Sequence, residues 1–330
     1  MKKIFRNIKK CDKGAFFSPL SLVLVVTPLL LSSCRHKDLV YDHPDSGHIN
    51  VVFDWRNAPS ANPSSMAFYL YDPDGENPIR YIFQNNYGGT IRVPASEYDA
   101  ICLNADLTDW AVINRKEAID NYEVTTLEEN VLPASGFSTR AVPRAESSEE
   151  EKITATPGFL WAARTNSIQI PAGTENKTII MYPQEKICHY VVDIYDSGDV
   201  SRYSASGIDG TLSGMSEGYL IGKDIAHSTK VTHPFLLRPV KSSNSLHAEF
   251  LTFGETPDSG EHHLSIYMIR DDGKKWNCNV DVTNQVKNAS DPRHVHIVVR
   301  GLDLPNPIGG GGGIIPDVDE WITVNINMKM

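Results

Sequence analysis

Residues 66–75 read MAFYLYDPDG, a run of six apolar residues followed by a turn sequence. Phe, Tyr and Leu suit a strand, whereas Asp, Pro and Gly favour a tight turn. Similar apolar runs recur along the first half of the chain, with Gly, Pro, Asn and Asp between them, over residues 50–55, 79–83, 90–93 and 98–103. A spacing of roughly 8–12 residues between such runs predicts an all-β sandwich or barrel.

The second half repeats this rhythm. Its predicted strands are residues 178–182, 186–195, 205–212, 218–221, 246–253, 263–269, 276–282 and 294–299. Residues 321–328 alternate strictly between apolar and polar side chains, as a strand with one buried face does. Residues 189–195 loosely resemble residues 49–55, which predicts two related β-sandwiches in tandem. A short helix is expected only over residues 114–122.

The N-terminus has the pattern of an export signal. Its basic residues are Lys2, Lys3, Arg6, Lys9, Lys10 and Lys13. An apolar run over residues 15–31 follows and ends in Leu31-Ser32-Ser33-Cys34. This order predicts a signal peptide, and the cysteine at the cut predicts lipidation of Cys34. A transmembrane helix is disfavoured, because the run contains two prolines and only roughly 17 apolar residues.

The expected domain organisation follows from these patterns. Residues 1–33 form the signal peptide and residues 34–47 a lipidated tether. Residues 48–152 form the N-terminal β-sandwich and residues 153–330 the C-terminal one. The first sandwich is expected to end in a charged loop or linker, because residues 135–152 are polar, charged and poor in apolar side chains.

Charge and cysteine content exclude several classes of protein. The chain carries a net charge of −10. Loss of residues 1–33 removes six basic residues and one acid, so the charge becomes −15. Binding of nucleic acid is therefore not expected. Cys102, Cys188 and Cys278 would remain without any Cys-x-x-Cys spacing. One disulfide is conceivable, but single cysteines buried in strands are the favoured interpretation.

The motifs that could carry chemistry are weak. Ser216 lies in a Gly-x-Ser-x-Gly sequence, but the segment around it predicts a turn rather than a strand–turn–helix elbow. His294 and His296 would share a strand face, and His262-His263 form a second pair. Solvent-facing histidines are favoured over metal ligands here. The glycines at residues 309–313 lack the Lys-Ser/Thr of a P-loop and predict a flexible connection. No catalytic residue, metal or cofactor is expected.

Four short phrases together resemble the fimbrillin superfamily of lipoproteins. They are LSGM at residues 212–215, FLTFG at 250–254, DVTNQV at 281–286 and PDVDEW at 316–321. The resemblance covers most of residues 186–330 and is weaker over residues 50–122. It implies tandem transthyretin-like β-sandwiches, exported as a lipidated precursor to the outer membrane.

The resemblance also implies a mode of assembly. Pilus subunits of this superfamily are cut by an Arg-specific protease and polymerise by donating a strand to a sheet edge. Arg56, Arg140 and Arg144 are candidate processing sites, although none lies in a matching motif. Trp321, Ile322, Val324, Ile326 and Met328 belong to a segment that is either an exchangeable strand or the last strand of its own domain. The second interpretation is favoured.

The expected function is therefore non-enzymatic. The chain is predicted to be a lipid-anchored fimbrial subunit or fimbria-associated adhesin of the outer membrane, facing either the surface or the periplasm. Expected partners are the membrane, other fimbrillin-like subunits, and a host or glycan ligand. The alternative is a stand-alone surface lipoprotein that binds glycans. A hydrolase built on Ser216 would need histidine and aspartate partners within hydrogen-bond reach.

Overall fold

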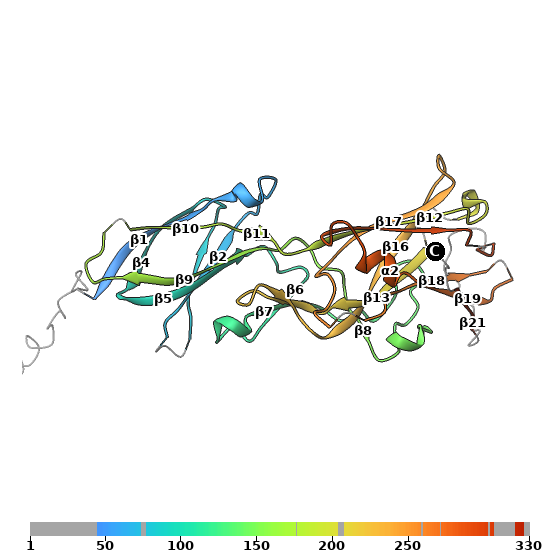
Figure 1. The fold of residues 1–330 in the computed structure, drawn as a ribbon, viewed down its shortest axis with the longest axis horizontal. Helices are drawn as coiled ribbons and strands as arrows, with labels where there is room; N and C mark the ends of the chain where they lie inside the picture. Colours follow the sequence, from blue (N-terminus) through green and yellow to red (C-terminus); the bar gives the residue numbers. More distant parts are fainter. Residues whose placement is uncertain are drawn as a thin grey trace, which may run out of the picture. The chain divides into compact units, whose positions relative to one another are not determined.

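The computed structural model describes residues 45–73, 77–175, 177–203, 208–258, 260–270, 272–302, 304–306 and 321–326. The all-β prediction is confirmed, because strands dominate and helices are short (Figure 1). The described helices are η1 (Trp55–Asn57), η2 (Ile119–Asn121), η3 (Glu146–Ser148), η4 (Val200–Arg202) and α2 (Thr283–Lys287). In this part of the chain, no helix is long and apolar enough to cross a membrane.

Two sheets make up the first sandwich. One has the order β10-β1-β4, with β10 (Lys177–Met181), β1 (Ser46–Phe53) and β4 (Gly88–Pro94). The other has the order β11-β9-β5-β2-β3, with β11 (Gln184–Glu185), β9 (Trp161–Ile170), β5 (Ser96–Asn104), β2 (Met66–Tyr71) and β3 (Ile79–Phe83). Alternate residues of β1 and β2, including Ile49, Val51, Met66 and Phe68, are buried in one apolar core between the sheets.

The expected division between residues 152 and 153 does not follow the sheets. β9 pairs antiparallel with β5, and β10 pairs in parallel with β1, so residues 161–185 complete the first sandwich. The chain leaves the first sandwich after β5 and returns to it with β9. The sequence pattern does not predict that residues 161–185 join the first sandwich. Apolar alternation shows which face of a strand is buried, but not which strand lies beside it.

The second sandwich is a continuous path of strands with the order β20-β12-β17-β16-β13-β18-β19-β21, with β8 beside β16. Its strands are β8 (Lys152–Ile153), β12 (Cys188–Tyr195), β13 (Ile208–Ser216), β16 (Lys230–Val240), β17 (Ser245–Thr252), β18 (His263–Ile269), β19 (Lys275–Asp281), β20 (His294–Arg300) and β21 (Trp321–Ile326). β16 pairs with β13 through its first part and with β17 through residues 238–240, so it belongs to both sheets.

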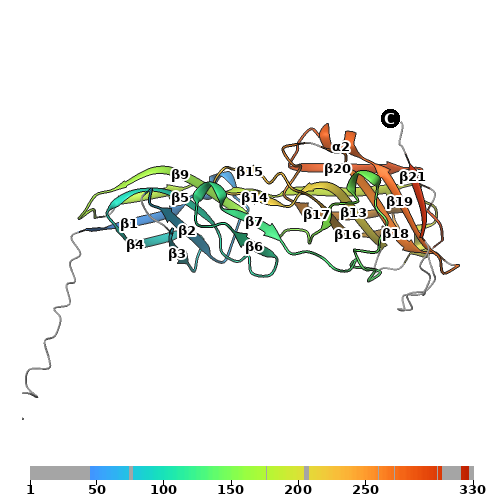
Figure 2. The same ribbon diagram turned by 90° about the horizontal axis from the view of Figure 1, so that it is seen from below.

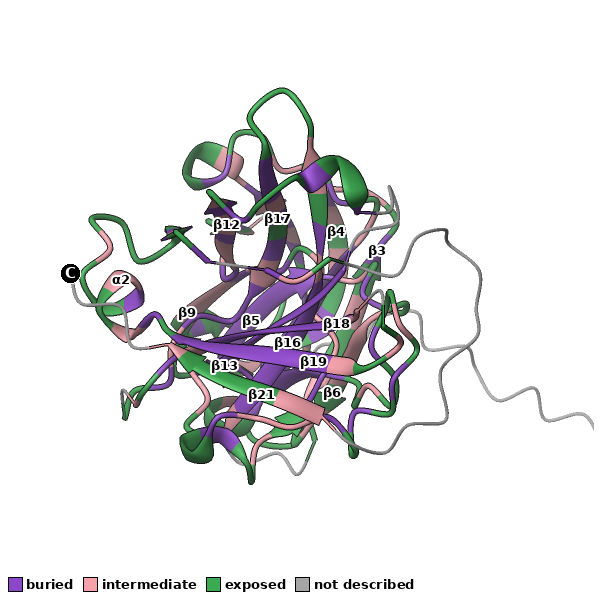
Figure 3. Ribbon diagram, turned by 90° about the vertical axis from the view of Figure 1, so that its right-hand side faces the viewer, coloured by how far each residue is buried: buried purple, intermediate pink, exposed green. Residues whose placement is uncertain are grey.

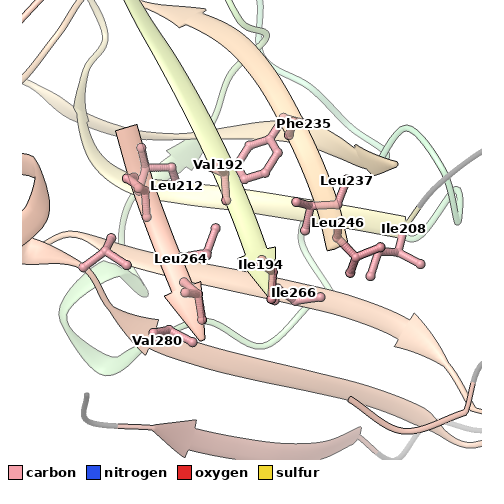
Figure 4. Close-up of a cluster of buried hydrophobic side chains, with 14 of the residues drawn as sticks. Val192, Ile194, Ile208, Leu212, Phe235, Leu237, Leu246, Leu264, Ile266 and Val280 are labelled. Carbon is pink, nitrogen blue, oxygen red and sulfur yellow. The ribbon is translucent and has the colours of Figure 1, made fainter. Parts of the chain in front are cut away.

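Apolar side chains from both sheets fill the second core. Val192 and Ile194 of β12 lie with Leu264 and Ile266 of β18 in one cluster (Figure 4). Each of these four side chains is fully buried. Complete burial of such a side chain stabilises the fold by about 1.5–3 kcal/mol, so this cluster fixes the arrangement of the sheets.

A smaller sheet has the order β15-β14-β7-β6. Its strands are β6 (Ala111–Asn114), β7 (Glu123–Thr126), β14 (Gly218–Leu220) and β15 (Ile225–Ala226). The helix predicted over residues 114–122 is wrong: Asn114 ends β6, and only the single turn η2 follows. Ile113 pairs with Val124 across this hairpin, so tertiary strand pairing overrides the local helical pattern.

Residues 135–152 were expected to be an exposed charged loop or linker. Up to Glu151 they form a loop with the single turn η3, but this loop is docked on a sheet rather than fully exposed. Residues 129–151, called the strap below, lie on the sheet of β13, β18 and β19. Leu132, Phe137 and Val142 of the strap are buried in a small cluster with Tyr267 of β18. The few apolar residues among the charges suffice to dock the segment, because the sheet beneath supplies the rest of the apolar surface.

Candidate functional site

The edge of the second sandwich beyond β19 is the candidate site. β21 pairs in parallel with β19, from Lys275 opposite Trp321 to Val280 opposite Ile326. Figure 2 and Figure 3 show the two strands side by side. The burial colours of Figure 3 show β19 mostly buried and β21 half-buried or exposed. If β21 is displaced, β19 becomes the edge strand and presents an unpaired row of backbone N–H and C=O groups to which another strand can be added.

The two faces of β21 meet different surroundings. Ile322 and Ile326 pack against the core of the second sandwich but are only partly buried. Val324, on the same face, remains 37% exposed. The other face carries Trp321 and Asn325, which make the specific contacts described next. Burial alone therefore holds β21 weakly.

Trp321 lies in an aromatic pocket. Its ring meets Phe137 of the strap at 5.0 Å and Tyr267 of β18 at 5.8 Å, both edge to face. The Lys275 ammonium lies 5.7 Å from the Phe137 ring and 6.0 Å from the Trp321 ring. Edge-to-face pairs and cation–π contacts each add a fraction of a kcal/mol to about 1.5 kcal/mol, so this pocket is the main anchor of the strand.

Amides and a hydroxyl form a row of hydrogen bonds across the same face. Ser265 Oγ donates to Asn279 Oδ1 at 2.6 Å, and Asn277 Nδ2 donates to the same oxygen at 3.2 Å. Asn279 Nδ2 in turn donates to Asn325 Oδ1 at 2.9 Å. The row therefore runs from β18 through β19 to β21 and fixes the register of the last strand.

Two carboxylates, of the buried Asp209 and the partly buried Glu151, fasten the strap that forms the wall of this pocket. Asp209 of β13 accepts the N–H groups of Ala134 and Ser135 at 2.6 and 2.8 Å. Glu151 accepts the Gly214 N–H at 3.0 Å and the Thr232 hydroxyl at 2.8 Å. Burial raises the pKa of both carboxyls, while these donors act in the opposite direction.

The candidate processing arginines differ in access. Arg140, in the strap, has a side chain that is 80% exposed, with Glu128 at 3.9 Å. Arg144 is held, because its guanidinium donates to the carbonyls of Glu151 and Thr139. Arg56 in η1 is exposed but pairs with Asp54, and this hydrogen bond lowers the pKa of the Asp54 carboxyl.

Ser216 is not part of a catalytic triad in the described structure. It ends β13 rather than lying in the predicted turn, because β13 continues through an irregularity between Leu212 and Met215. Its fully buried hydroxyl bonds to the carbonyl oxygens of Gly218 and His227, both at 2.8 Å. No histidine ring is hydrogen-bonded to this hydroxyl among the described residues, so the hydrolase hypothesis has no support.

The histidines form pairs with carboxylates. His294 lies 2.8 Å from Asp291, and His296 lies 2.7 Å from Asp193. His262 is buried, not solvent-facing, and lies 3.2 Å from Glu255. Across the described ranges, no cluster of three or more His, Cys, Asp or Glu side chains could hold a metal ion.

Cys102 and Cys278 are buried and Cys188 is partly buried, and all three are free thiols. Burial raises the pKa of Cys102 to about 12 and that of Cys188 and Cys278 to about 11, so these thiols are unreactive at neutral pH. Several predictions lie outside the described residues: lipidation of Cys34, the place of Met328 in the last strand, and the flexible glycines at 309–313.

Sequence reasoning found the last strand but missed what holds it. The signal was present, because Asn277 and Asn279 alternate in one predicted strand and Asn325 and Asn327 alternate in another. Amides at a spacing of two residues lie on one face of a strand, where they can form a ladder. Phe137 gave no such signal, because it stands alone in a polar segment.

Known proteins resemble this chain in sequence and fold. It is 23% identical over 337 residues to a candidate fimbrium anchoring subunit, Fim4B, of Bacteroides ovatus, covering 91% of this chain and 94% of that protein. The structure of a candidate adhesin from Bacteroides ovatus gives a TM-score of 0.58 at 17% identity, covering 83% of this chain and 98% of that one.

A candidate polysaccharide-binding protein from Bacteroides thetaiotaomicron gives a TM-score of 0.50 at 10% identity, over 80% of this chain and 93% of that one. The predicted resemblance to fimbrial proteins is confirmed by the Fim4B relative, and the β-sandwich fold by the two structures. A family model matches residues 33–236, more than half of the chain, and the protein therefore belongs to the family described as a domain of unknown function, DUF5119.

Proposed function

We propose that this protein is a non-catalytic fimbrial subunit that anchors or caps a fimbrium through strand addition at the β19 edge. The main observation behind this proposal is the geometry of β21, a half-exposed strand that pairs in parallel with β19 at the end of the sheet. The likeness to Fim4B over 91% of the chain supports the same role. Strand addition suits such an edge, because a partner's strand gains main-chain hydrogen bonds along its whole length.

The membrane attachment is part of the proposal. Lipid on Cys34 would hold the chain in the outer membrane, and residues 35–44 would connect it to β1. A Cys34→Ser variant should leave the membrane fraction and appear in the soluble envelope fraction. Retention of this variant in the membrane would contradict the lipid anchor but would not bear on strand addition at β19.

An unboiled SDS gel of envelope fractions, probed with antibody to this chain, tests the fimbrial role. We expect high-molecular-weight species that contain this chain and disappear on boiling, because strand-added complexes resist SDS but not heat. A ladder with regular steps would indicate a stalk subunit, whereas one or two discrete species would indicate an anchor or cap. A single band near the monomer, boiled or not, would contradict assembly.

One observation favours the alternative of glycan binding. Phe159 is 46% exposed and stacks on Trp161 at 5.3 Å with an interplanar angle of 5°. His189 lies 6.0 Å from Phe159 and stacks on His294 at 5.1 Å. Exposed rings in a row can stack on sugar rings. Binding on a glycan array that a Phe159→Ala variant loses would support this role, and a blank array would dismiss it.

A further inference from the structure

We propose that the β19 edge selects its occupant by side chains, and that a partner subunit's strand with asparagine at the positions of both Thr323 and Asn325 fits it better than β21 does. The partner strand would also carry an aromatic residue at the position of Trp321. The inference rests on the proposed function, because it takes β21 to be replaceable. It adds the sequence pattern that the partner must have.

The aromatic requirement comes from the pocket around Trp321. Phe137 and Tyr267 both meet its ring edge to face, and the Lys275 ammonium lies near it. A strand without an aromatic residue at this position would remove the edge-to-face contacts of Phe137 and Tyr267 and would leave the Lys275 ammonium with the Phe137 ring alone. The pocket therefore sets the first position of the register opposite Lys275.

The first asparagine requirement comes from Asn279. Its side chain is buried and donates to Asn325 Oδ1 at 2.9 Å on the facing residue of β21. A strand shifted by one residue would turn its side chains to the opposite face. A strand shifted by two would leave the Asn279 amide without its acceptor, which is costly for a buried donor.

The second asparagine requirement comes from an unmet hydrogen bond. Asn277 is fully buried, and its Oδ1 has no partner among the residues that the structure describes. Its neighbour on β21 is Thr323, whose hydroxyl is hydrogen-bonded to none of the described residues. Two residues farther on, Asn279 and Asn325 show that facing amides on these strands reach each other.

An asparagine opposite Asn277 would therefore extend the ladder by one step. In parallel strands in register, stacked amides form such ladders readily. β21 has Thr323 at this position and makes no such hydrogen bond to Asn277. It therefore binds the edge less favourably than a strand that makes this bond. This difference gives a partner strand the means to displace β21.

Labelled peptides with the sequence of residues 319–328 test the selection, added to the full chain purified in detergent and followed by fluorescence anisotropy. The peptide of unchanged sequence should exchange into the edge. A Thr323→Asn peptide should bind about tenfold more tightly, and an Asn325→Leu peptide about tenfold more weakly. A Thr323→Val peptide is the matched control and should bind like the unchanged peptide.

A chain variant, Asn277→Leu, completes the test. It should abolish the advantage of the Thr323→Asn peptide and keep binding of the unchanged peptide. Equal binding of the Thr323→Asn and Thr323→Val peptides, or an advantage that persists in the Asn277→Leu chain, would overturn the inference. Failure of every peptide to exchange would also overturn it.

The outcome is distinguishable from that of the proposed function. Selective peptide binding with only monomers in the envelope would keep the selection and reject the fimbrial role. Heat-sensitive envelope complexes together with unselective peptide binding would keep the fimbrial role and reject the selection by side chains.

Discussion

Two edge strands of this protein, β10 and β21, both join their neighbours in parallel but are held in different ways. β10 buries Ile179 and Met181 in the core of the first sandwich. β21 buries Ile322 and Ile326 only in part and depends on contacts of its outer face with Phe137 and Asn279. Burial fixes a strand regardless of its partners, whereas side-chain contacts at an exposed edge allow replacement by a strand that makes them better.

The largest expected effect is on stability when the buried side of β10 is truncated. Met181→Ala should lower the free energy of unfolding by about 2–5 kcal/mol. Ile326→Ala in β21 should lower it by only about 1 kcal/mol, because that side chain is partly exposed. Urea unfolding measures both, with the exposed Ile180→Ala as control, expected within about 0.5 kcal/mol of the unchanged chain. Equal losses of unfolding free energy for Met181→Ala and Ile326→Ala would show that β10 and β21 are held equally by burial.

The second sandwich should also carry a pH dependence through His233, a fully buried residue of β16. Burial lowers its pKa from 6.5 to about 4. The unfolded chain binds this proton as the pH falls through about 6.5, but the folded chain does not until about pH 4. The stability contribution is thus present above pH 6.5 and is lost as the pH falls to 4, by about 3 kcal/mol.

Urea unfolding at pH 7.5 and pH 4 measures this loss. A His233→Leu variant should lose about 3 kcal/mol less than the unchanged chain between the two pH values. The exposed His294→Gln variant should behave like the unchanged chain and serves as control. Identical pH dependence in all three chains would show that His233 is not buried as described.

A smaller effect should follow when the strap loses its contact with β21. Phe137→Ala removes one wall of the Trp321 pocket, which should weaken the hold on β21 by about 1–2 kcal/mol. Amide hydrogen exchange of residues 321–326 should then quicken about tenfold, while residues 177–181 are unchanged. Phe159→Ala, which lies outside the pocket, is the control. Unchanged exchange at residues 321–326 would show that the strap does not hold the strand.

The smallest effect concerns proteolysis of the strap itself. An Arg-specific protease should cut after Arg140 before it cuts after Arg144, because only the Arg144 guanidinium is hydrogen-bonded to the chain. Mass spectrometry of a time course gives the order. Arg140→Gln should delay the first cut in the strap and Arg144→Gln should not, and the opposite order would contradict the described contacts.

The sequence predicted much of the fold, because alternation and turn residues are local signals. It placed most strands of the two sandwiches, including the last strand. It did not predict β9 and β16, the two longest strands that the structure describes, nor the hairpin of β6 and β7. It did not predict that residues 161–185 return to the first sandwich, since strand partners are chosen by packing over long separations. The strap was expected to be a charged loop or linker, and its docking was not predicted because its apolar residues, such as Phe137 and Val142, are few.

The candidate site shows the same division. Trp321 and the alternating strand were visible in the sequence, whereas the pocket and the amide row needed three strands and the strap to be brought together. The serine motif failed for a related reason. A five-residue match carries no information about whether Ser216 is exposed, and here it is fully buried.

Hydrogen exchange of the full chain, measured alone and in complexes isolated from the envelope, tests the central claim most directly. The account predicts that residues 177–181 stay protected in both states. Residues 321–326 should lose protection in the complex, while residues 275–281 of β19 keep theirs because a partner strand has taken the place of β21. Protection of residues 321–326 that matches that of β10 and does not change on assembly would contradict the account.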